Sequence, residues 1–529
     1  MLAKVHSFGL SGLDAYPVTI EVDVCRGIPC TMIVGLPDSA VKESKERVRA
    51  AIINSGFKYP SRRVTINLSP ADVKKEGPAF DLAVALVYLT ASGQINGSRL
   101  ERLAFLGELS LDGAIRPVNG ILSIAMTAPR NRFEGLVVPA ANAREAALAG
   151  QIPIFPAQSL NEVIQFLQEP QTIPVFPEVS VNQFLKKQLV DDIDFRDVKG
   201  QSLVKRGLEI AAAGGHNVLM IGPPGSGKSM LAQRMVTILP DMTREECLST
   251  TRIHSVMGLV QPDQGLITSR PFRSPHHSCS DVALIGGGSI PKPGEVSLSH
   301  NGILFLDELP EFTRTALESL RQPLEDRTVT VARAAKTLRF PARFMLVASM
   351  NPCLCGQYGN SRAVCRCNPG QIQKYRSKIS GPLLDRIDIH LDVPAVNYPE
   401  LSNTTVSESS EQIRQRVNTT RIAQLKRFST EGACPAYGGG SASGGKRDGG
   451  LVSNAQMSHR QVRKFCALGK EENELLKKAL TELNFSARAY DKILKVSRTI
   501  ADLEGSEPIQ TAHLAEAIQY RSLDRNWWG

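Results

Sequence analysis

The sequence predicts an α/β protein of several domains, organised around a strand, a glycine-rich loop and a helix. The apolar run Val218–Ile221 is expected to form a short buried strand. The loop 222–229 follows it directly and leads into a helical pattern of apolar residues. A second apolar run, 302–306, ends in the acids Asp307 and Glu308. These features predict an α/β core built round a phosphate-binding site.

The glycine-rich loop carries the residues expected to hold a polyphosphate. Its glycines allow successive backbone N–H groups to point inward, and the following helix adds its positive end. Lys228 would reach the β- and γ-phosphates, and Ser229 would hold Mg²⁺ through its hydroxyl. The predicted nucleotide-binding residues of this loop are Gly222, Pro223, Pro224, Gly225, Ser226, Gly227, Lys228, Ser229 and Met230.

The two acids supply the second half of the predicted site. Asp307 is a candidate metal-shell carboxylate, and Glu308 is a candidate to polarise the attacking water. Taken alone, they could be acids at the solvent end of a buried strand. Paired with the loop, they predict hydrolysis of ATP with Mg²⁺.

Composition narrows the class of partner. The 529 residues carry a formal net charge of +10, which favours a polyanionic partner such as nucleic acid. An aromatic content of 5% argues against base stacking as the main grip. No segment approaches the roughly 20 apolar residues of a membrane span, and residues 1–10 lack a signal-peptide core. We therefore expect a soluble, cytoplasmic protein without membrane contact.

The pattern of apolar residues divides the chain into four parts. Residues 1–170 alternate strands and helices, as in the strand pattern of Val18, Ile20, Val22 and Val24, and predict an α/β sandwich. Residues 171–190 read as a linker, and 191–397 form the predicted nucleotide-binding core. Residues 398–529 are helical and contain a Gly/Ser-rich insertion at 432–450.

The first part resembles a Lon-type protease domain. The resemblance rests on Asn67-Leu68-Ser69-Pro70, residues 76–81, residues 106–113 and Arg116-Pro117-Val118-Asn119-Gly120. The Ser and Lys of that family's catalytic dyad would fall at Ala79 and near Leu122, neither of which can act as nucleophile or base. We expect a catalytically inactive, structural or partner-binding domain; the alternative is a dyad rebuilt elsewhere.

The core resembles the magnesium-chelatase-type branch of the AAA+ superfamily. The resemblance rests on residues 194–201, the insertion 257–295 with Arg270-Pro271-Phe272-Arg273-Ser274-Pro275-His276-His277, and residues 296–302. It implies a three-layer P-loop core with an α-helical lid, and contact of Val198 with the adenine. His276 and His277 could indicate a metal, although a polar loop fixed by hydrogen bonds explains them better.

The same resemblance assigns roles to three further residues. Asn351, after a predicted strand, corresponds to the first sensor that orients water beside Glu308. Arg386 lies where relatives carry an arginine finger that completes the neighbouring subunit's site. Arg488 matches the second sensor, which touches the γ-phosphate from the lid. A finger acting on a neighbour implies an oligomer.

Residues 327–343 alternate in a pattern that predicts a β-hairpin. In relatives of this branch such a hairpin lines the central pore of a hexamer, where Arg333, Lys336 and Arg339 would grip DNA phosphates without reading sequence. The alternative is an ordinary solvated hairpin.

Four cysteines form a cluster at 353–367. Cys353, Cys355, Cys365 and Cys367 could close a tetrahedral Zn²⁺ shell. Their Cys-x-Cys spacing is tighter than the usual spacing of structural zinc sites. Four reduced thiols are the main alternative, and redox switching is a lesser one.

Over nearly its whole length the chain resembles the ComM/YifB family of magnesium-chelatase-like ATPases. The resemblance rests on the order of Lon-like domain, AAA+ core with four-cysteine loop, and helical lid. It implies a homo-hexameric DNA translocase or helicase that promotes branch migration during natural transformation, contacting single-stranded or branched DNA and recombination proteins. Alternatives are a magnesium-chelatase motor subunit driving metal insertion into a porphyrin, an ATP-dependent protease, and a non-enzymatic scaffold.

Overall fold

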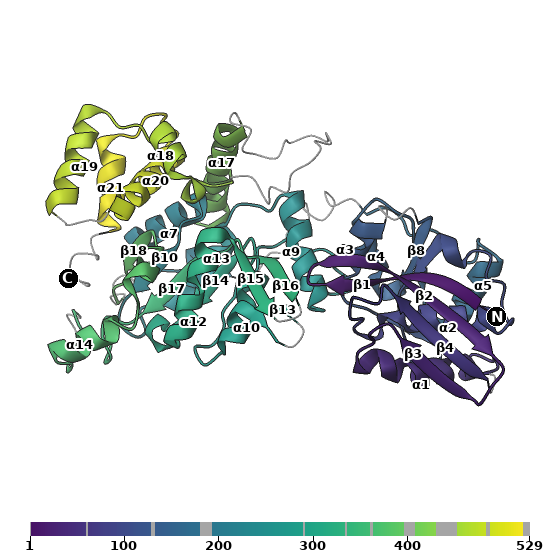
Figure 1. The fold of residues 1–529 in the computed structure, drawn as a ribbon. Helices are drawn as coiled ribbons and strands as arrows, with labels where there is room; N and C mark the ends of the chain where they lie inside the picture. Colours follow the sequence, from purple (N-terminus) through teal and green to yellow (C-terminus); the bar gives the residue numbers. More distant parts are fainter. Residues whose placement is uncertain are drawn as a thin grey trace.

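The computed structural model describes most of the chain. The described residues are 2–59, 62–128, 133–179, 193–288, 291–333, 336–359, 363–395, 408–429, 452–482 and 487–521. They form three lobes in a row (Figure 1). Two neighbouring lobes are α/β, and the third, at the end farthest from the N-terminus, is helical. We call them the N-terminal lobe, the central lobe and the helical lobe.

The N-terminal lobe is built on a seven-stranded mixed sheet in the order β3-β4-β2-β1-β5-β8-β9. Val18, Ile20, Val22 and Val24 of β2 are all buried, which confirms the predicted alternation. Helices α1, α2 and α5 supply the apolar residues of the core on one face, and α3 and α4 cover the other. The strands and helices of this lobe are β1 Leu2–Ser11, β2 Asp14–Cys25, β3 Cys30–Val34, α1 Ser39–Asn54, β4 Arg63–Ser69, α2 Asp81–Ala91, β5 Leu103–Phe105, β6 Glu108–Leu109, β7 Ile115–Arg116, α3 Ile121–Thr127, β8 Gly135–Pro139, α4 Ala143–Ala147, β9 Ile154–Ala157 and α5 Leu160–Gln168.

The central lobe contains a five-stranded sheet in the order β11-β14-β17-β10-β18, and every pairing in it is parallel. This confirms the predicted mixed α/β fold with a phosphate-loop strand inside a sheet. Its elements are α7 Ser202–Gly214, β10 Val218–Ile221, α8 Lys228–Ile238, α9 Arg244–Val256, β11 Phe272–Arg273, α10 Asp281–Ile285, β12 Gly286–Gly287, β13 Lys292–Pro293, α11 Glu295–Leu298, β14 Ile303–Leu306, α12 Arg314–Ser319, α13 Arg321–Asp326, β15 Thr328–Arg333, β16 Lys336–Pro341, β17 Met345–Met350, α14 Pro369–Arg376, α15 Gly381–Leu384 and β18 Ile389–Asp392.

Alternate residues of this sheet serve two different cores. Val218 and Met220 face α7, α8 and the helical lobe, whereas Leu219 and Ile221 face α12 and its neighbours. Each strand therefore buries both faces, as the continuous apolar runs in the sequence require. The result is a sheet between two helical layers.

The helical lobe packs on the first of these layers. Its helix α17 (Ser410–Ser429) contacts α7 and α8, and α20 (Ala487–Leu503) contacts α7. The remaining helices are α18 His459–Phe465, α19 Lys470–Glu482 and α21 Thr511–Gln519. The predicted Gly/Ser-rich insertion 432–450 lies outside the described residues. Among the described helices, none is both long and apolar enough to cross a membrane.

One expected helix is divided. The sequence predicts a single helix over 314–323, but the structure has α12 and α13, which meet at Leu320. Pro323 has no N–H to donate, and its ring would clash with the carbonyl four residues earlier in a continuous helix. In α13 it occupies the first turn, where no intrahelical donor is needed.

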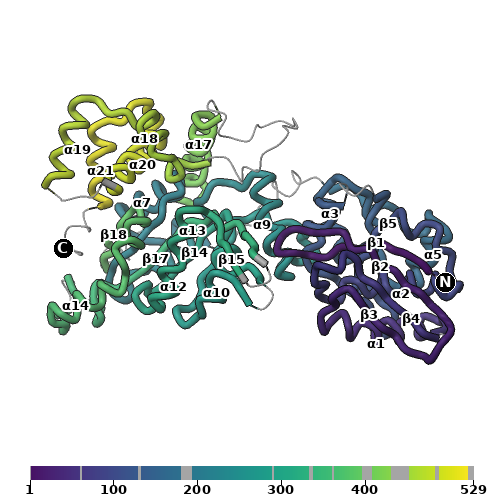
Figure 2. The backbone as a smooth tube through the Cα atoms, viewed as in Figure 1, coloured from purple at the N-terminus to yellow at the C-terminus, as the bar shows by residue number. Residues whose placement is uncertain are grey.

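Helix α9 joins the central lobe to the N-terminal lobe, as the tube in Figure 2 makes visible. Arg252 of α9 donates to the Leu13 carbonyl at 2.9 Å and to Ser123 at 3.3 Å. The hydroxyl of Ser255 donates a hydrogen bond to the carboxylate of Glu145. That carboxylate is buried, and its burial raises its pKa. Leu122 packs with Met242 and Cys247 in an apolar patch between the lobes. Several polar and apolar contacts thus fix the two lobes together.

The helical lobe is held to the central sheet by a buried charged pair. Asp388 lies 3.3 Å from Lys492 of α20, and its carboxylate also lies 3.3 Å from His216. Burial alone raises the pKa of Asp388, but Lys492 and His216 outweigh that effect and lower it. Burial likewise lowers the pKa of Lys492 to about 8, so the ammonium depends on its carboxylate partner.

We expect Asp388→Ala to lower the free energy of unfolding by about 3 kcal/mol, because Lys492 would be left buried without a carboxylate. Urea unfolding followed by circular dichroism measures the change. The matched control is Glu311→Ala, which removes the exposed pair with Lys378 and should cost at most about 0.5 kcal/mol. Equal midpoints for the two variants would show that the buried pair contributes nothing special.

Candidate active site

The phosphate-binding loop follows the carboxyl end of β10. Gly227 has φ +88° at the residue before α8, a conformation that side chains with a Cβ rarely adopt. Gly222 is required for a different reason, because a Cβ there would lie 2.2 Å from the carbonyl oxygen of Val393. The loop therefore combines tight backbone packing with a left-handed turn into the helix.

Lys228 lies inside this loop at the start of α8. Its ammonium donates to the carbonyls of Gly222 at 2.8 Å and Pro223 at 2.9 Å, and to Oδ1 of Asn351 at 3.3 Å. Burial lowers the pKa of Lys228, against the opposing effect of the Asp307 and Glu308 charges. Asn351 follows β17, so the lysine joins the first loop to the end of a neighbouring strand.

Asp307 lies next to Ser229, whose hydroxyl donates a hydrogen bond to the Asp307 carboxylate at 2.7 Å. Its other oxygen accepts from the backbone N–H of Glu308 at 3.1 Å and from the Ser349 hydroxyl. Hydroxyl and carboxylate oxygens of this kind are the ligands that Mg²⁺ prefers. The pair Ser229 and Asp307 therefore fits a magnesium ion held together with phosphate oxygens.

The contribution of Ser349 was not predicted from the sequence. The signal lies in the sheet register, because Leu306 pairs with Ala348 in parallel strands. The next residues, Asp307 and Ser349, therefore emerge side by side. Strand order and register were needed to find this contact.

Glu308 adopts φ +51°, an uncommon conformation for a residue with a side chain, and is exposed at the site. Its carboxylate lies 3.7 Å from Nδ1 of His277. The ring centroid of His277 lies 4.1 Å from that of His276, and the two rings are tilted by 34°. The histidine pair thus belongs to a loop beside the acid. No metal-ligand group of three or more in the described residues includes either histidine.

The segment before α7 lies against the phosphate-binding loop. Gln201 donates from Nε2 to the carbonyl of Ser226 at 2.9 Å and to that of Pro394 at 3.0 Å. Val198 is buried at 1% exposure in the apolar core beside it. Met230, in the first turn of α8, is 37% exposed. The residues predicted to contact nucleotide therefore gather round the loop.

Arg386 and Arg488 lie at the opposite edge of the sheet. Asn217, which precedes β10, donates to the carbonyl of Arg386 at 2.8 Å, whereas the phosphate-binding loop follows β10. Arg488 pairs with the neighbouring Asp385 at 3.2 Å. The 4 residues of β10 lie between the two edges, a distance of about 13 Å. Neither arginine contacts the phosphate-binding loop of its own chain in the described interactions.

The hairpin predicted at 327–343 is present as β15 and β16, with Arg333 paired to Lys336 at its tip. Val329 and Phe340 bury one face in the central lobe. Arg339 is exposed on β16, and the side chains of Arg333 and Lys336 lie outside the described part of the structure. The hairpin also touches the N-terminal lobe, because Leu338 borders Gly12.

The four cysteines predicted as a cluster come together, and all their sulfur atoms lie within 4.8 Å of one another. Cys353 lies 3.4 Å from Cys355 and 3.7 Å from Cys365, and Cys355 lies 3.6 Å from Cys365. A tetrahedron with metal–sulfur bonds of about 2.3 Å separates its sulfurs by about 3.8 Å. Hydrogen bonds from the backbone of Arg366 and Gln357 lower the pKa of Cys355 to about 6, which favours a thiolate. The cluster can hold a metal ion.

The sheet order, the loop after β10 and the acids after β14 define a P-loop protein of the AAA+ type. Comparison with protein families agrees. Residues 194–401 match "Magnesium chelatase, subunit ChlI", residues 20–142 match "Subunit ChlI of Mg-chelatase", and residues 407–521 match "Magnesium chelatase, subunit ChlI C-terminal".

Among curated proteins, the chain is 43% identical to Competence protein ComM of Haemophilus influenzae, over 99% of this chain and 98% of that protein. It is 42% identical to Uncharacterized protein YifB of Escherichia coli, with the same coverage. The chain belongs to the ComM/YifB family of magnesium-chelatase-like proteins, as its sequence predicts. A more distant match is DNA helicase MCM8 of Bos taurus, 25% identical over 43% of this chain and 26% of that protein. The family points to an ATPase.

Proposed function

We propose that this protein is an ATP-driven DNA motor that works as a ring of six identical subunits and promotes branch migration in homologous recombination. The observation that carries the proposal is the separation of the site into two edges. Lys228, Ser229, Asp307 and Glu308 gather at the carboxyl edge of the sheet, whereas Arg386 is at the amino edge. A complete site then needs two subunits, and a ring supplies them in repeated order.

In this proposal each residue of the site has one task. Lys228 and the loop backbone would hold the phosphates of ATP. Ser229 and Asp307 would hold Mg²⁺, whose charge would offset the negative charge of the phosphates. Glu308 accepts a proton from the attacking water, which Asn351 helps to orient. Arg386 of the adjoining subunit stabilises charge on the γ-phosphoryl oxygens, and Arg488 contacts the same group.

Two observations favour DNA as the polymer on which the motor moves: the cationic residues of the hairpin and the names of the relatives. The sequence of the hairpin carries Arg333, Lys336 and Arg339, which six subunits would repeat round one axis. Such a ring of cations attracts a phosphate backbone of any sequence. A relative named as a competence protein and a distant relative named as a DNA helicase support this choice over porphyrin metal insertion.

A protease role finds no support in the N-terminal lobe. Ala79 carries no nucleophile, and Leu122 is buried at 0% exposure against Met242 and Cys247 of the central lobe. We propose instead that this Lon-like lobe is structural, and braces α9 and the hairpin.

The motor proposal predicts that DNA accelerates ATP hydrolysis at low salt. Lys336→Ala should keep the basal rate while weakening DNA binding about threefold to tenfold, because one phosphate contact per subunit is lost. A coupled ATPase assay with a DNA titration measures both quantities. The matched control is Lys477→Ala, an exposed lysine of α19. Hydrolysis that does not respond to DNA at low salt would overturn the proposed function.

A mixing experiment tests whether the site is shared. Arg386→Ala and Lys228→Ala should each abolish hydrolysis when alone, with losses of about 10³ or more for the arginine. When the two inactive proteins are mixed, activity should return, because about a quarter of the seams combine an intact loop with an intact arginine. Failure to recover activity in assemblies that demonstrably contain both chains would place Arg386 outside the reaction.

We further propose that the four cysteines hold Zn²⁺ and brace the loop that carries Asn351. Metal analysis of undenatured protein should find about one zinc per chain, since four thiolates complete its shell. Cys365→Ser should lose the metal and unfold at lower temperature. Cys25→Ser, at an exposed cysteine outside the cluster, is the control and should retain zinc. A native preparation without zinc would refute the assignment.

A further inference from the structure

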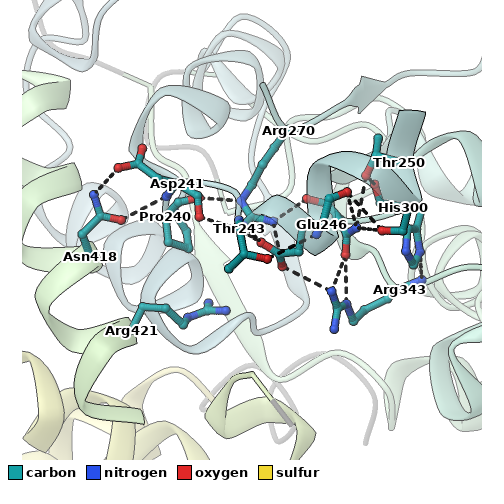
Figure 3. Close-up of polar contacts among 12 residues, drawn as sticks. Pro240, Asp241, Thr243, Glu246, Thr250, Arg270, His300, Arg343, Asn418 and Arg421 are labelled. Atoms are coloured by element: carbon teal, nitrogen blue, oxygen red, sulfur yellow. Dashed lines mark hydrogen bonds and ion pairs between the residues drawn. The ribbon is translucent and has the colours of Figure 1, made fainter. Parts of the chain in front are cut away.

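A second charged cluster lies at the amino edge of the central sheet, away from the phosphate-binding loop. Glu246 of α9 pairs with Arg270 at 2.9 Å and with Arg343 at 3.2 Å (Figure 3). Burial by itself raises the pKa of Glu246, but the two arginines outweigh it and lower the pKa to about 2. The carboxylate is therefore ionised throughout the neutral range.

The guanidinium N–H groups of Arg270 and Arg343 have several hydrogen-bond acceptors. Arg270 donates to the carbonyls of Pro240, Asp241 and Asn301 at 2.5, 3.1 and 2.7 Å, in addition to Glu246. Arg343 donates twice to Oδ1 of Asn301, at 2.6 and 2.9 Å. One carboxylate and several carbonyl oxygens thus serve two guanidinium groups.

Arg421 of α17 brings a third guanidinium to this cluster, and its end points toward the other residues in Figure 3. Its Nε is buried and has no hydrogen-bond partner among the described residues. One terminal nitrogen makes long hydrogen bonds to the carbonyls of Ala212 and Ala213, at 3.4 and 3.3 Å. Burial first, and then the charges of Arg270 and Arg343, lower the pKa of Arg421 to about 9, so it stays charged at neutral pH.

The three arginines exceed the acids that face them. Glu246 is the one carboxylate that pairs with any of them among the described residues. Asp241 accepts from Asn418 at 2.9 Å through its side chain. Counting ion pairs alone, three guanidinium groups share one carboxylate, an excess of two positive charges. Such an excess is costly where water is restricted unless an anion compensates.

A cavity of about 70 Å³ lies among these residues, lined by Arg270, Arg343 and Arg421 together with the polar residues Glu246, Ser453 and Gln456. A single water needs only about 10–15 Å³ of such space. The space accommodates a small tetrahedral oxyanion and is too small for a nucleotide. It borders Gly302 before β14 and Met345 at the start of β17, which locates it at the amino edge of the sheet.

We propose that this cavity binds a small tetrahedral oxyanion of the phosphate class, held by the guanidinium groups of Arg270, Arg343 and Arg421 that line it. The anion joins α17 of the helical lobe to the central lobe and uses the buried Nε of Arg421, which no group among the described residues satisfies. The site is independent of the proposed motor function, because no residue of the phosphate-binding loop takes part.

The plainer role for Arg421 is to cap the C-terminal end of α7. Ala212 and Ala213 lie in the last turn of that helix, where a cation is favourable. This role explains the two long hydrogen bonds but leaves the Nε and the charge excess without a partner. The two roles differ in what they predict when the charge is removed.

Thermal unfolding of the nucleotide-free full chain in inorganic phosphate, against sodium chloride at equal ionic strength, tests the proposal. At about 20 mM phosphate we expect the midpoint of the native protein to rise by about 3 °C through binding to the folded state. Lys228→Ala should retain most of this rise, because it removes phosphate binding at the nucleotide loop alone. Arg421→Met should lose it.

The same variants separate the anion site from simple capping. Without phosphate, Arg421→Met should unfold at or above the native midpoint, because replacing an uncompensated, partly buried charge by an apolar group is often stabilising. A clearly lower midpoint would favour capping and overturn the proposal. An equal rise of the midpoint with phosphate in native protein and in Arg421→Met would also overturn it. Should Arg421→Met not fold, Arg421→Gln takes its place. Calorimetric titration of phosphate into Lys228→Ala should also detect one site per chain, and its absence would overturn the proposal.

Discussion

The amide side chain of Asn217 joins the strands at the amino edge of the central sheet. Its Nδ2 donates to the carbonyl of Arg386 at 2.8 Å, and its Oδ1 accepts from the backbone of Leu346 at 2.9 Å. One residue thereby ties the starts of β10, β17 and β18. Because the strands are parallel, aligning their starts also aligns their ends, where the nucleotide residues emerge. The geometry of Lys228, Asp307 and Asn351 depends on this alignment.

The two edges of the sheet carry different chemistry. The carboxyl edge combines a lysine and a phosphate-binding loop with two acids, as binding a metal and a polyphosphate requires. The amino edge gathers Arg386, Arg488 and the cluster around Glu246. Arg386 pairs there with Glu325 and Arg488 with Asp385, and both proposals above direct arginines of this edge toward anionic groups. A sheet only 4 residues deep at β10 thus separates these two groups of residues.

The N-terminal lobe contacts the central lobe at the hairpin and at α9. Its turn between β1 and β2 borders the hairpin at Leu338, and its helices grip α9 through Glu145 and Leu122. Movements of the hairpin or of α9 must therefore be accommodated by this lobe. Burial of Leu122 gives a physical reason why position 122 is apolar here, since a lysine would be desolvated between the lobes.

The sequence by itself determined the features that depend on neighbouring residues. The loop 222–229, the acids after β14, the hairpin and the cysteine cluster all follow from short-range pattern, and the structure contains each of them. Their geometry is local, because glycine conformation, strand alternation and turn formation act over a few residues. The relationship to the ComM/YifB family could be recognised from the sequence for the same reason, because it rests on short motifs. Even here Pro323 divided a helix that the apolar pattern predicts as one.

Only the tertiary structure decided which distant residues meet. It set Ser349 beside Asp307, His277 beside Glu308, and Arg421 beside a cluster drawn from other elements. It also separated Arg386 and Arg488 from the loop of their own chain. These outcomes depend on strand order, register and the docking of α17, which arise from long-range burial of apolar faces. No local pattern encodes them, because side chains far apart in sequence share an edge only after the sheet has formed.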